Sequence, residues 1–149
     1  MGVAPGRAGV TRDLGNGYEL SDDRDRLDRA AVHAYLTTSY WALGRTRERQ
    51  DHLIDVCHVV GLYHEGAQVG FARAVDCEAA HFVYLADVYV LEEHRGQGLG
   101  VELVREIVEN GPYADRTWVL HTRDAAGLYE RFRFRHHERL MQRDAQTGV

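Results

Sequence analysis

The stretch Tyr84-Leu85-Ala86-Asp87-Val88-Tyr89-Val90-Leu91-Glu92-Glu93-His94-Arg95-Gly96-Gln97-Gly98-Leu99-Gly100 decides the fold of this 149-residue chain. Residues 82–90 are apolar, aromatic or β-branched with one charge among them, which is typical of a strand buried on both faces. After a short polar segment, apolar residues recur at helical spacing from Leu99 onward. The stretch therefore predicts a buried strand, a glycine-rich loop and a helix, in that order.

The glycine-rich loop falls where the predicted helix begins. Gly96, Gly98 and Gly100 permit backbone angles and close approaches that a Cβ would hinder. The first-turn N–H groups have no intrahelical partner, and the helix dipole adds partial positive charge, so the loop can hold an anion. Arg95 adds a charged donor at the same place. A dinucleotide fingerprint would need a small residue at Val101 and a Walker loop would need Gly-Lys-Ser/Thr, so neither of these phosphate sites fits.

The pattern Arg95-x-x-Gly98-x-Gly100 directly after Asp87-Val88-Tyr89-Val90 resembles the acetyl-CoA-binding motif of the GNAT N-acyltransferase superfamily. Residues 124–132, Asp-Ala-Ala-Gly-Leu-Tyr-Glu-Arg-Phe, are similar to that family's helix-plus-tyrosine segment. The resemblance implies a single-domain GNAT-like α/β fold, with a central mixed, mostly antiparallel sheet of six to seven strands and about four helices on both faces. The chain departs from the pattern at Asp124, where many relatives carry asparagine, and at Arg133, where a glycine is usual.

The resemblance also implies an acetyl-CoA site, with the pyrophosphate on the loop and the pantetheine arm paired with the central strand. The residues that match are Val88, Tyr89, Val90, Arg95, Gly96, Gln97, Gly98, Leu99, Gly100 and Asp124. Tyr129 matches the family's usual general acid, because a phenol is protonated at neutral pH and can donate to a departing thiolate. The alternative for Tyr129 is a core aromatic whose hydroxyl finds a backbone partner.

Two residues are candidates for the base that deprotonates the amine. Asp87 is the single acid in an apolar strand, where it could accept a proton or could be a structural aspartate bonded to neighbouring N–H groups. His121 ends the strand after the central helix and is either a base or a partly exposed strand-end histidine. The aromatic side chains of Tyr35, Tyr40 and Trp41 could wall the acceptor pocket, although aromatics at helical spacing are also typical of a core.

The rest of the chain predicts one domain over residues 18–149 after a flexible leader at residues 1–17, which carry five glycines. Further predicted strands cover residues 18–21, 59–63, 69–75, 117–121 and part of 133–143, with a turn at Glu65-Gly66. Predicted helices cover residues 24–39, 47–56, 98–110 and 125–131, the last of them capped by Asp124.

The composition limits the class of partner. The net charge of −5 and the pI of about 6.0 do not indicate a basic surface that would bind nucleic acid, and they favour a cationic or neutral acceptor. Cys57 and Cys77 are too few for a disulfide scaffold, and we find neither a secretory leader nor an apolar run of membrane-spanning length. Nine histidines show no metal-ligand spacing. We expect a cytoplasmic protein without a metal, a nucleic acid or a membrane as partner.

These observations predict an acetyl-CoA-dependent N-acetyltransferase that moves an acetyl group directly to a primary amine of a small molecule or peptide. An acyl-cysteine route is set aside because neither cysteine lies in the two motifs. Two alternatives stay open: a non-catalytic acyl-CoA-binding sensor or scaffold, and an interaction domain whose glycine loop binds nothing. A homodimer is expected through a sheet edge or the surface, since the predicted C-terminal strands are exposed candidates.

Overall fold

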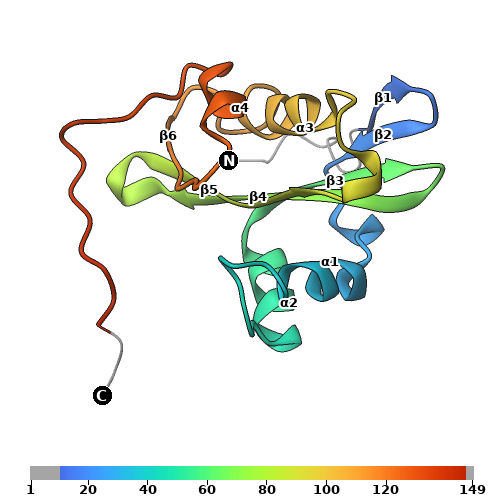
Figure 1. Cartoon of the computed structure of the whole chain (residues 1–149), viewed down its shortest axis with the longest axis horizontal. Helices are drawn as coiled ribbons and strands as arrows, with labels where there is room; N and C mark the ends of the chain where they lie inside the picture. The colour runs from blue at the N-terminus through green and yellow to red at the C-terminus, as the bar shows by residue number, and fades with distance from the viewer. Residues whose placement is uncertain (1–10, 147–149) are drawn as a thin grey trace, which may run out of the picture.

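The computed structural model describes residues 11–146, which form one six-stranded sheet with helices on both faces (Figure 1). The strands lie side by side in chain order, antiparallel throughout except for the last pair, and are β1 Thr11–Gly15, β2 Tyr18–Ser21, β3 His58–His64, β4 Ala67–Cys77, β5 Phe82–Val90 and β6 Thr117–Val119. This mixed, mostly antiparallel sheet confirms the predicted fold class. Within residues 11–146, no helix has the length and apolarity that a membrane crossing requires.

Four α-helices cover the sheet, two on each face (Figure 1). Helices α1 (Arg29–Leu36) and α2 (Arg47–Val56) lie on one face, and α3 (Leu99–Val108) and α4 (Ala126–Glu130) lie on the other. Helix α3 buries Leu103, Val104 and Ile107 completely against the sheet. Burial of an aliphatic side chain of this size stabilises the fold by about 1.5–3 kcal/mol. The apolar period after the glycine loop therefore fixes α3 to the sheet and, with it, the position of the loop.

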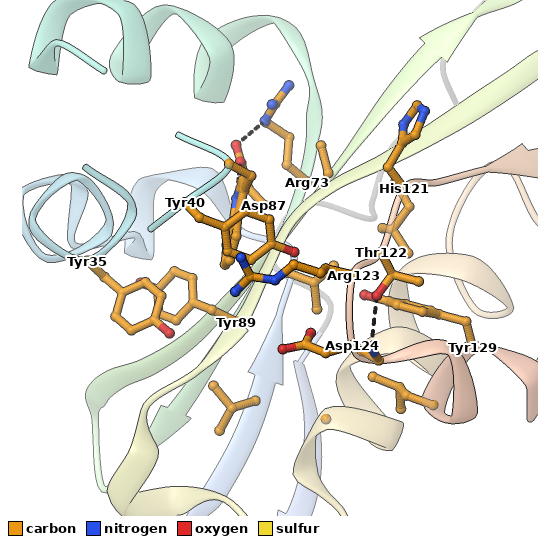
Figure 2. Close-up of a pocket in the computed structure, with 18 of the residues that line it drawn as sticks. Tyr35, Tyr40, Arg73, Asp87, Tyr89, His121, Thr122, Arg123, Asp124 and Tyr129 are labelled. Carbon is orange, nitrogen blue, oxygen red and sulfur yellow. Dashed lines mark hydrogen bonds and ion pairs between the residues drawn. The ribbon is translucent and has the colours of Figure 1, made fainter. Parts of the chain in front are cut away.

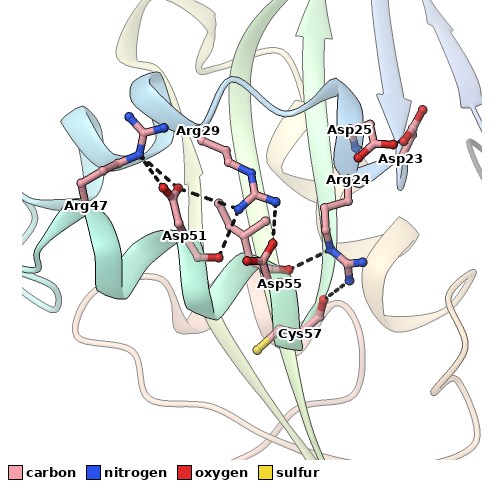
Figure 3. A network of polar contacts seen from close by, with 9 residues as sticks. Asp23, Arg24, Asp25, Arg29, Arg47, Asp51, Asp55 and Cys57 are labelled. Carbon is pink, nitrogen blue, oxygen red and sulfur yellow. Dashed lines mark hydrogen bonds and ion pairs between the residues drawn. The ribbon is translucent and has the colours of Figure 1, made fainter.

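Ion pairs and arginine contacts hold α1 and α2 together and tie the segment before α1 to the end of α2 (Figure 3). Arg29 of α1 reaches Asp55 of α2 at 2.7 Å, and Arg24 donates to the carbonyl oxygens of Ile54 at 2.9 Å and Cys57 at 2.8 Å. Arg24 belongs to the short 3-10 helix η1 (Arg24–Arg26) that precedes α1. These contacts hold α1 and α2 side by side, and the segment that joins the two helices forms one wall of the site described below.

A bulge interrupts β5 at its centre. Phe71 of β4 pairs with Tyr89 and Arg73 pairs with Ala86, so two residues of β5, Asp87 and Val88, lie opposite one residue of β4. Asp87 has a φ of 54°, in the left-handed region that residues other than glycine rarely adopt. The extra residue changes the face to which side chains point: Leu85 belongs to the α3 core, whereas Tyr89, four residues later, belongs to the core under α1.

Two predictions for the first third of the chain were wrong. The helix expected over residues 24–39 is divided into η1 and α1, because Asp28 leaves the helix and caps α1 by accepting a hydrogen bond from the Ala31 N–H at 3.0 Å. The leader expected over residues 1–17 includes β1, which pairs with β2 and is held to α3 by Arg12, 2.7 Å from Glu106 and 2.9 Å from Glu102. Residues 1–10 lie outside the described residues.

The C-terminal predictions need two further corrections. The strand expected within residues 133–143 is absent, because adjacent apolar residues such as Leu140 and Met141 both face solvent and give no buried face; the segment runs along the outside of the molecule (Figure 1). Asp124 does not cap α4, because the helix begins one residue later, with Ala125 at the N-cap, and Thr122 Oγ1 accepts from the Ala125 N–H at 3.0 Å.

Candidate active site

A cleft opens where β5 and β6 separate. The two strands pair only between Phe82–Tyr84 and Thr117–Val119. Beyond Tyr84, the edge of β5 that faces β6 has no sheet partner in the described part of the chain. Its N–H and C=O groups are therefore available to an extended ligand, apart from the Val90 carbonyl, which accepts a hydrogen bond from Arg95. A cavity of about 950 Å³ lies at this opening.

The cavity brings together residues that the sequence placed in separate segments. Its walls come from β5, the glycine loop, the segment from α1 to α2, the loop after β6, and α4. Of the predicted site residues, those that line it are Tyr35, Tyr40, Trp41, Asp87, Val88, Tyr89, Val90, Arg95, Gly96, Gly98, Leu99, Gly100, His121, Asp124 and Tyr129. Gln97 does not line the cavity; its amide lies 3.3 Å from the Tyr18 hydroxyl.

The glycine loop leaves the N-terminus of α3 open to the cavity. Gly96 and Gly98 have φ values of 81° and 78°, and Gly98 is the N-cap, so no side chain caps the helix. A Cβ at Gly98 or Gly100 would meet no atom within 4 Å. Glycine is therefore required at position 98 by its backbone angle and not by crowding. The space beside these backbone N–H groups fits a phosphate or pyrophosphate.

Arg95 ties this loop to the end of β5 and to α1. Its Nε donates to the Val90 carbonyl at 2.8 Å, and a terminal nitrogen donates to the Tyr35 hydroxyl at 2.9 Å. Tyr35 in turn stacks on Tyr89, with ring centroids 4.0 Å apart. The guanidinium is thus held beside the open helix terminus, where it can meet an anion.

Asp87 is the centre of a buried polar network. One carboxylate oxygen accepts from the Trp41 indole at 3.0 Å, and the other accepts from Arg45 at 2.7 Å and Arg73 at 2.8 Å. Figure 2 shows the contact between Arg73 and Asp87. Burial alone would lower the pKa of Arg73, but Asp87 and Cys57 outweigh it and the pKa is raised, so this guanidinium stays charged. Both carboxylate oxygens are therefore occupied, which favours the structural alternative for Asp87 over the role of base.

His121 forms a chain of hydrogen bonds that starts in β5 and ends in the C-terminal segment. Its Nδ1 pairs with the Tyr84 hydroxyl and its Nε2 pairs with Gln142 Oε1, and the Gln142 amide nitrogen donates to Asp144 at 2.6 Å. Because an amide oxygen can only accept, His121 carries its proton on Nε2 and accepts the Tyr84 hydroxyl proton at Nδ1. Burial raises the pKa of Tyr84, and the backbone of His121 offsets part of that increase.

Tyr129 lies on the opposite side of the cleft from β5, on α4 (Figure 2). Its ring meets Phe134 edge to face at 5.8 Å. Within residues 11–146, its hydroxyl makes no hydrogen bond. The structure therefore does not show the alternative in which Tyr129 is a core aromatic bonded to the backbone. Burial, with a smaller contribution from Tyr40, raises the pKa of Tyr129 to about 12. The phenol is therefore a protonated donor that faces the cavity at any physiological pH.

Four of the residues in these contacts were missed by the sequence reasoning, namely Arg45, Arg73, Tyr84 and Arg123. Arg123 reaches from the loop before α4 to Tyr40, with its guanidinium carbon 3.8 Å from the ring centroid (Figure 2). One signal was available: Arg73 is the lone charge of the apolar residues 69–75, and Asp87 is the lone charge of the apolar residues 82–90. Opposite charges in such strands predict a buried pair. Among residues 11–146 there is no cluster of metal-binding side chains.

Comparison with known proteins agrees with this geometry. The family model described as an acetyltransferase (GNAT) domain matches residues 55–136, more than half of the chain. A protein from Xanthomonas campestris assigned to the GNAT acetyltransferase family is 33% identical, with a TM-score of 0.79 over 86% of this chain and 93% of its own.

Two more distant structures share the fold alone. A GCN5-related N-acetyltransferase from Ralstonia eutropha is 16% identical, with a TM-score of 0.58 over 91% of this chain and 98% of its own. A "predicted acetyltransferase" from Clostridium acetobutylicum, whose structure contains acetyl-CoA, is 9% identical, with a TM-score of 0.62 over 91% of this chain and 96% of its own. No curated protein sequence matches the chain.

Proposed function

The chain belongs to the GNAT family of acetyltransferases, and we propose that it moves the acetyl group of acetyl-CoA directly to a primary amine of a small molecule or peptide that enters the cleft between β5 and β6. One observation carries this proposal: the N-terminus of α3 without a side-chain cap, the unpaired edge of β5 and the protonated Tyr129 all line one cavity. Each of these features supplies one requirement of acyl transfer from a thioester.

The residues present fit acetyl-CoA. Backbone N–H groups from Gly98 to Gly100, together with Arg95, would hold the pyrophosphate, because the space beside these glycines is open. The free edge of β5 from Val88 to Val90 would pair with the amide groups of the pantetheine arm. When bound, acetyl-CoA supplies a thioester whose carbonyl carbon accepts the amine and whose sulfur leaves as a thiolate.

We assign the removal of the amine proton to Tyr84 and His121 acting as a pair. As the new N–C bond forms, the amine proton passes to Tyr84 Oη while the phenolic proton moves to His121 Nδ1. His121 then carries both protons, with Nε2–H held on Gln142 Oε1. The charged groups around the pair are Arg73 and Asp87 beside Tyr84, and Asp144 behind Gln142. Arg123 and Asp124 follow His121 in its own loop.

Tyr129 completes the proton balance on the other side of the cleft. As the C–S bond breaks, its hydroxyl gives a proton to the departing thiolate, and solvent later restores that proton. Burial suits Tyr129 to this task, because a pKa of about 12 keeps the proton available. Neither Cys57 nor Cys77 lines the cavity, which supports direct transfer over an acyl-cysteine route.

Thiol release from acetyl-CoA over a panel of amines tests the proposal. The panel contains polyamines, amino acids, aminoglycosides, aryl amines and peptides, with the acetylated product identified by mass. Tyr129→Phe should lower turnover by about two to four orders of magnitude with little change in cofactor affinity. Tyr113→Phe is the matched control, because Tyr113 lies outside the cavity. Tight acetyl-CoA binding without transfer to any amine would favour the sensor alternative and reject the proposal.

The same assay tests whether Tyr84 and His121 remove the amine proton. Tyr84→Phe and His121→Asn should each reduce turnover most at low pH, and the rate should recover as rising pH supplies neutral amine. A loss of the same size at every pH would mean that the pair only positions the acceptor.

We also propose that the chain forms a homodimer, from observations that do not depend on the active site. Within residues 11–146, strand β6 pairs with β5 alone, and the exposed side chains of Leu140 and Met141 lie in the C-terminal segment that passes near it. Light scattering at high micromolar concentration checks this: a dimeric mass is expected, and a monomeric mass rejects the proposal.

A further inference from the structure

The acceptor side of the cavity holds more cations than its one buried carboxylate neutralises. Arg45 and Arg73 share the same oxygen of Asp87, at 2.7 Å and 2.8 Å, and their side chains are 16% and 8% exposed. Their other acceptors are the Gln50 amide oxygen, 2.9 Å from Arg45, and Cys57 Sγ, 3.5 Å from Arg73, so Asp87 is the one carboxylate that balances two guanidinium groups. A buried charge without compensation is costly, so a ligand that brings a negative charge is favoured there.

A third guanidinium lies at the mouth of the same space. Arg123 makes no hydrogen bond or ion pair within the described residues, and the neighbouring Asp124 does not pair with it. It is held instead by its stacking on Tyr40, 3.8 Å from guanidinium carbon to ring centroid (Figure 2). Stacking occupies the flat face of a guanidinium and leaves its edge N–H groups free, which is the geometry that binds a carboxylate with two parallel hydrogen bonds.

Arg123 is not placed to serve the phosphates of the acyl donor. The anion site at the helix terminus already has its own arginine, Arg95, fixed by Val90 and Tyr35. Arg123 contacts Tyr40, which belongs to the segment between α1 and α2 together with Trp41 and Arg45. The free N–H groups of Arg123 therefore lie beside the segment between α1 and α2, which forms the acceptor side of the cavity.

We propose that the acceptor is an amine that also carries a carboxylate, bound by Arg123 at the mouth with Arg45 deeper in the cavity. This inference rests on the proposed acetyl transfer. The net charge of −5 does not oppose it, because the local field and not the total charge governs what enters a cleft. The same cations disfavour the ammonium form of the amine, and so they increase the fraction of neutral nucleophile.

Matched acceptor pairs test the inference. Each pair is an amino acid and its amide: phenylalanine with phenylalaninamide, and 4-aminobutyrate with its amide. Rates are referred to the concentration of neutral amine, because amidation changes the pKa of the amine as well as the charge of the carboxyl group. We expect kcat/KM of the acid to exceed that of the amide by about tenfold or more, through KM, as for a charge-assisted contact. Arg123→Gln should bring this ratio toward one while the Kd for acetyl-CoA stays unchanged. Arg116→Gln, a surface arginine outside the cavity, should keep the ratio.

The outcomes are distinct. Equal use of acid and amide by the wild-type protein overturns the inference and leaves acetyl transfer intact. Weaker acetyl-CoA binding by Arg123→Gln also overturns it, because the arginine would then serve the donor. If acetyl-CoA binds but no amine of either kind is acetylated, the proposed function fails and the inference fails with it.

Discussion

Replacement of Asp87 by asparagine tests the buried network from which the acceptor wall is built. Asparagine has nearly the same shape, tolerates the left-handed backbone that Asp87 adopts at a φ of 54°, and keeps an oxygen that can accept from Trp41. What it removes is the negative charge between Arg45 and Arg73. Any loss of stability is therefore attributable to the loss of the charge and of the oxygen that accepts from Arg45 and Arg73, and not to packing or backbone strain.

The structure sets the size of the expected loss. The Asp87 side chain is 1% exposed and that of Arg73 is 8% exposed, so breaking their pair leaves a guanidinium without a counter-charge in the interior. Removal of one partner from such a pair costs about 3–5 kcal/mol, and the retained amide oxygen places Asp87→Asn near the lower end. A loss of about 3 kcal/mol is large against a total stability of about 5–15 kcal/mol.

Urea unfolding followed by circular dichroism measures this loss. Asp76→Asn is the matched control, because Asp76 pairs with Arg116 where the side chains are 28% and 26% exposed, and such a pair contributes about 0–1 kcal/mol. Adding Arg73→Met should recover part of the stability lost in Asp87→Asn, since an apolar side chain needs no counter-charge. An Asp87→Asn protein that is as stable as wild type but inactive would refute the structural role and return Asp87 to the role of base.

Three further predictions concern the loop and the buried tyrosines. Gly98→Asp should abolish acetyl-CoA binding, whereas Gly66→Asp, at a similar positive φ and with equally open space but in the β3–β4 turn, should leave it unchanged; a calorimetric titration compares the two. With the pKa of Tyr129 at about 12, kcat should not decline up to pH 10, and a fall with an apparent pKa near 9 would contradict the assigned acid. Tyr63 has a buried hydroxyl without a hydrogen-bond partner, and burial raises its pKa to about 12, so the unfolded chain releases this proton near pH 10 while the folded chain retains it. The contribution of Tyr63 to the free energy of unfolding should therefore be constant below pH 10 and be lost above it, and Tyr63→Phe should reduce the fall in stability above pH 10 at no cost to stability at pH 7.

The parts of the fold that were predictable are those encoded by local signals. Residues 82–108 contain an apolar strand, three glycines and a helical period in direct succession, and each signal acts within a few residues of the structure it produces. The β3–β4 hairpin is similar, because Glu65 and Gly66 adopt the positive φ angles that its two-residue turn needs. Asp28 shows the limit: helical periodicity extends across it, and only the hydrogen bond to Ala31 reveals that the helix starts there.

The bulge in β5 could not be predicted, because the strand carries apolar residues on both faces. A strand that is apolar on both faces has no alternation, so an extra residue causes no visible break in the pattern. Yet this one residue determines the face to which Asp87 and Tyr89 point. Contacts across long separations were equally hidden: Trp41 and Asp87 lie 46 positions apart, and Tyr40 meets Arg123 from the other end of the chain.

The bulge also explains why the two candidate bases are not equivalent. Tyr84 lies before it, where β5 still pairs with β6, and therefore meets His121 in the loop that follows β6. Asp87 lies within the bulge and points instead toward Arg45 and Arg73, which occupy one of its carboxylate oxygens while Trp41 occupies the other. A carboxylate so engaged would have to give up these contacts to bind a proton, whereas the Tyr84 and His121 pair can shift a proton along a hydrogen bond that already exists. The bulge thus directs Asp87 toward Arg45 and Arg73 on the acceptor side of the cavity, and it leaves removal of the amine proton to Tyr84 and His121.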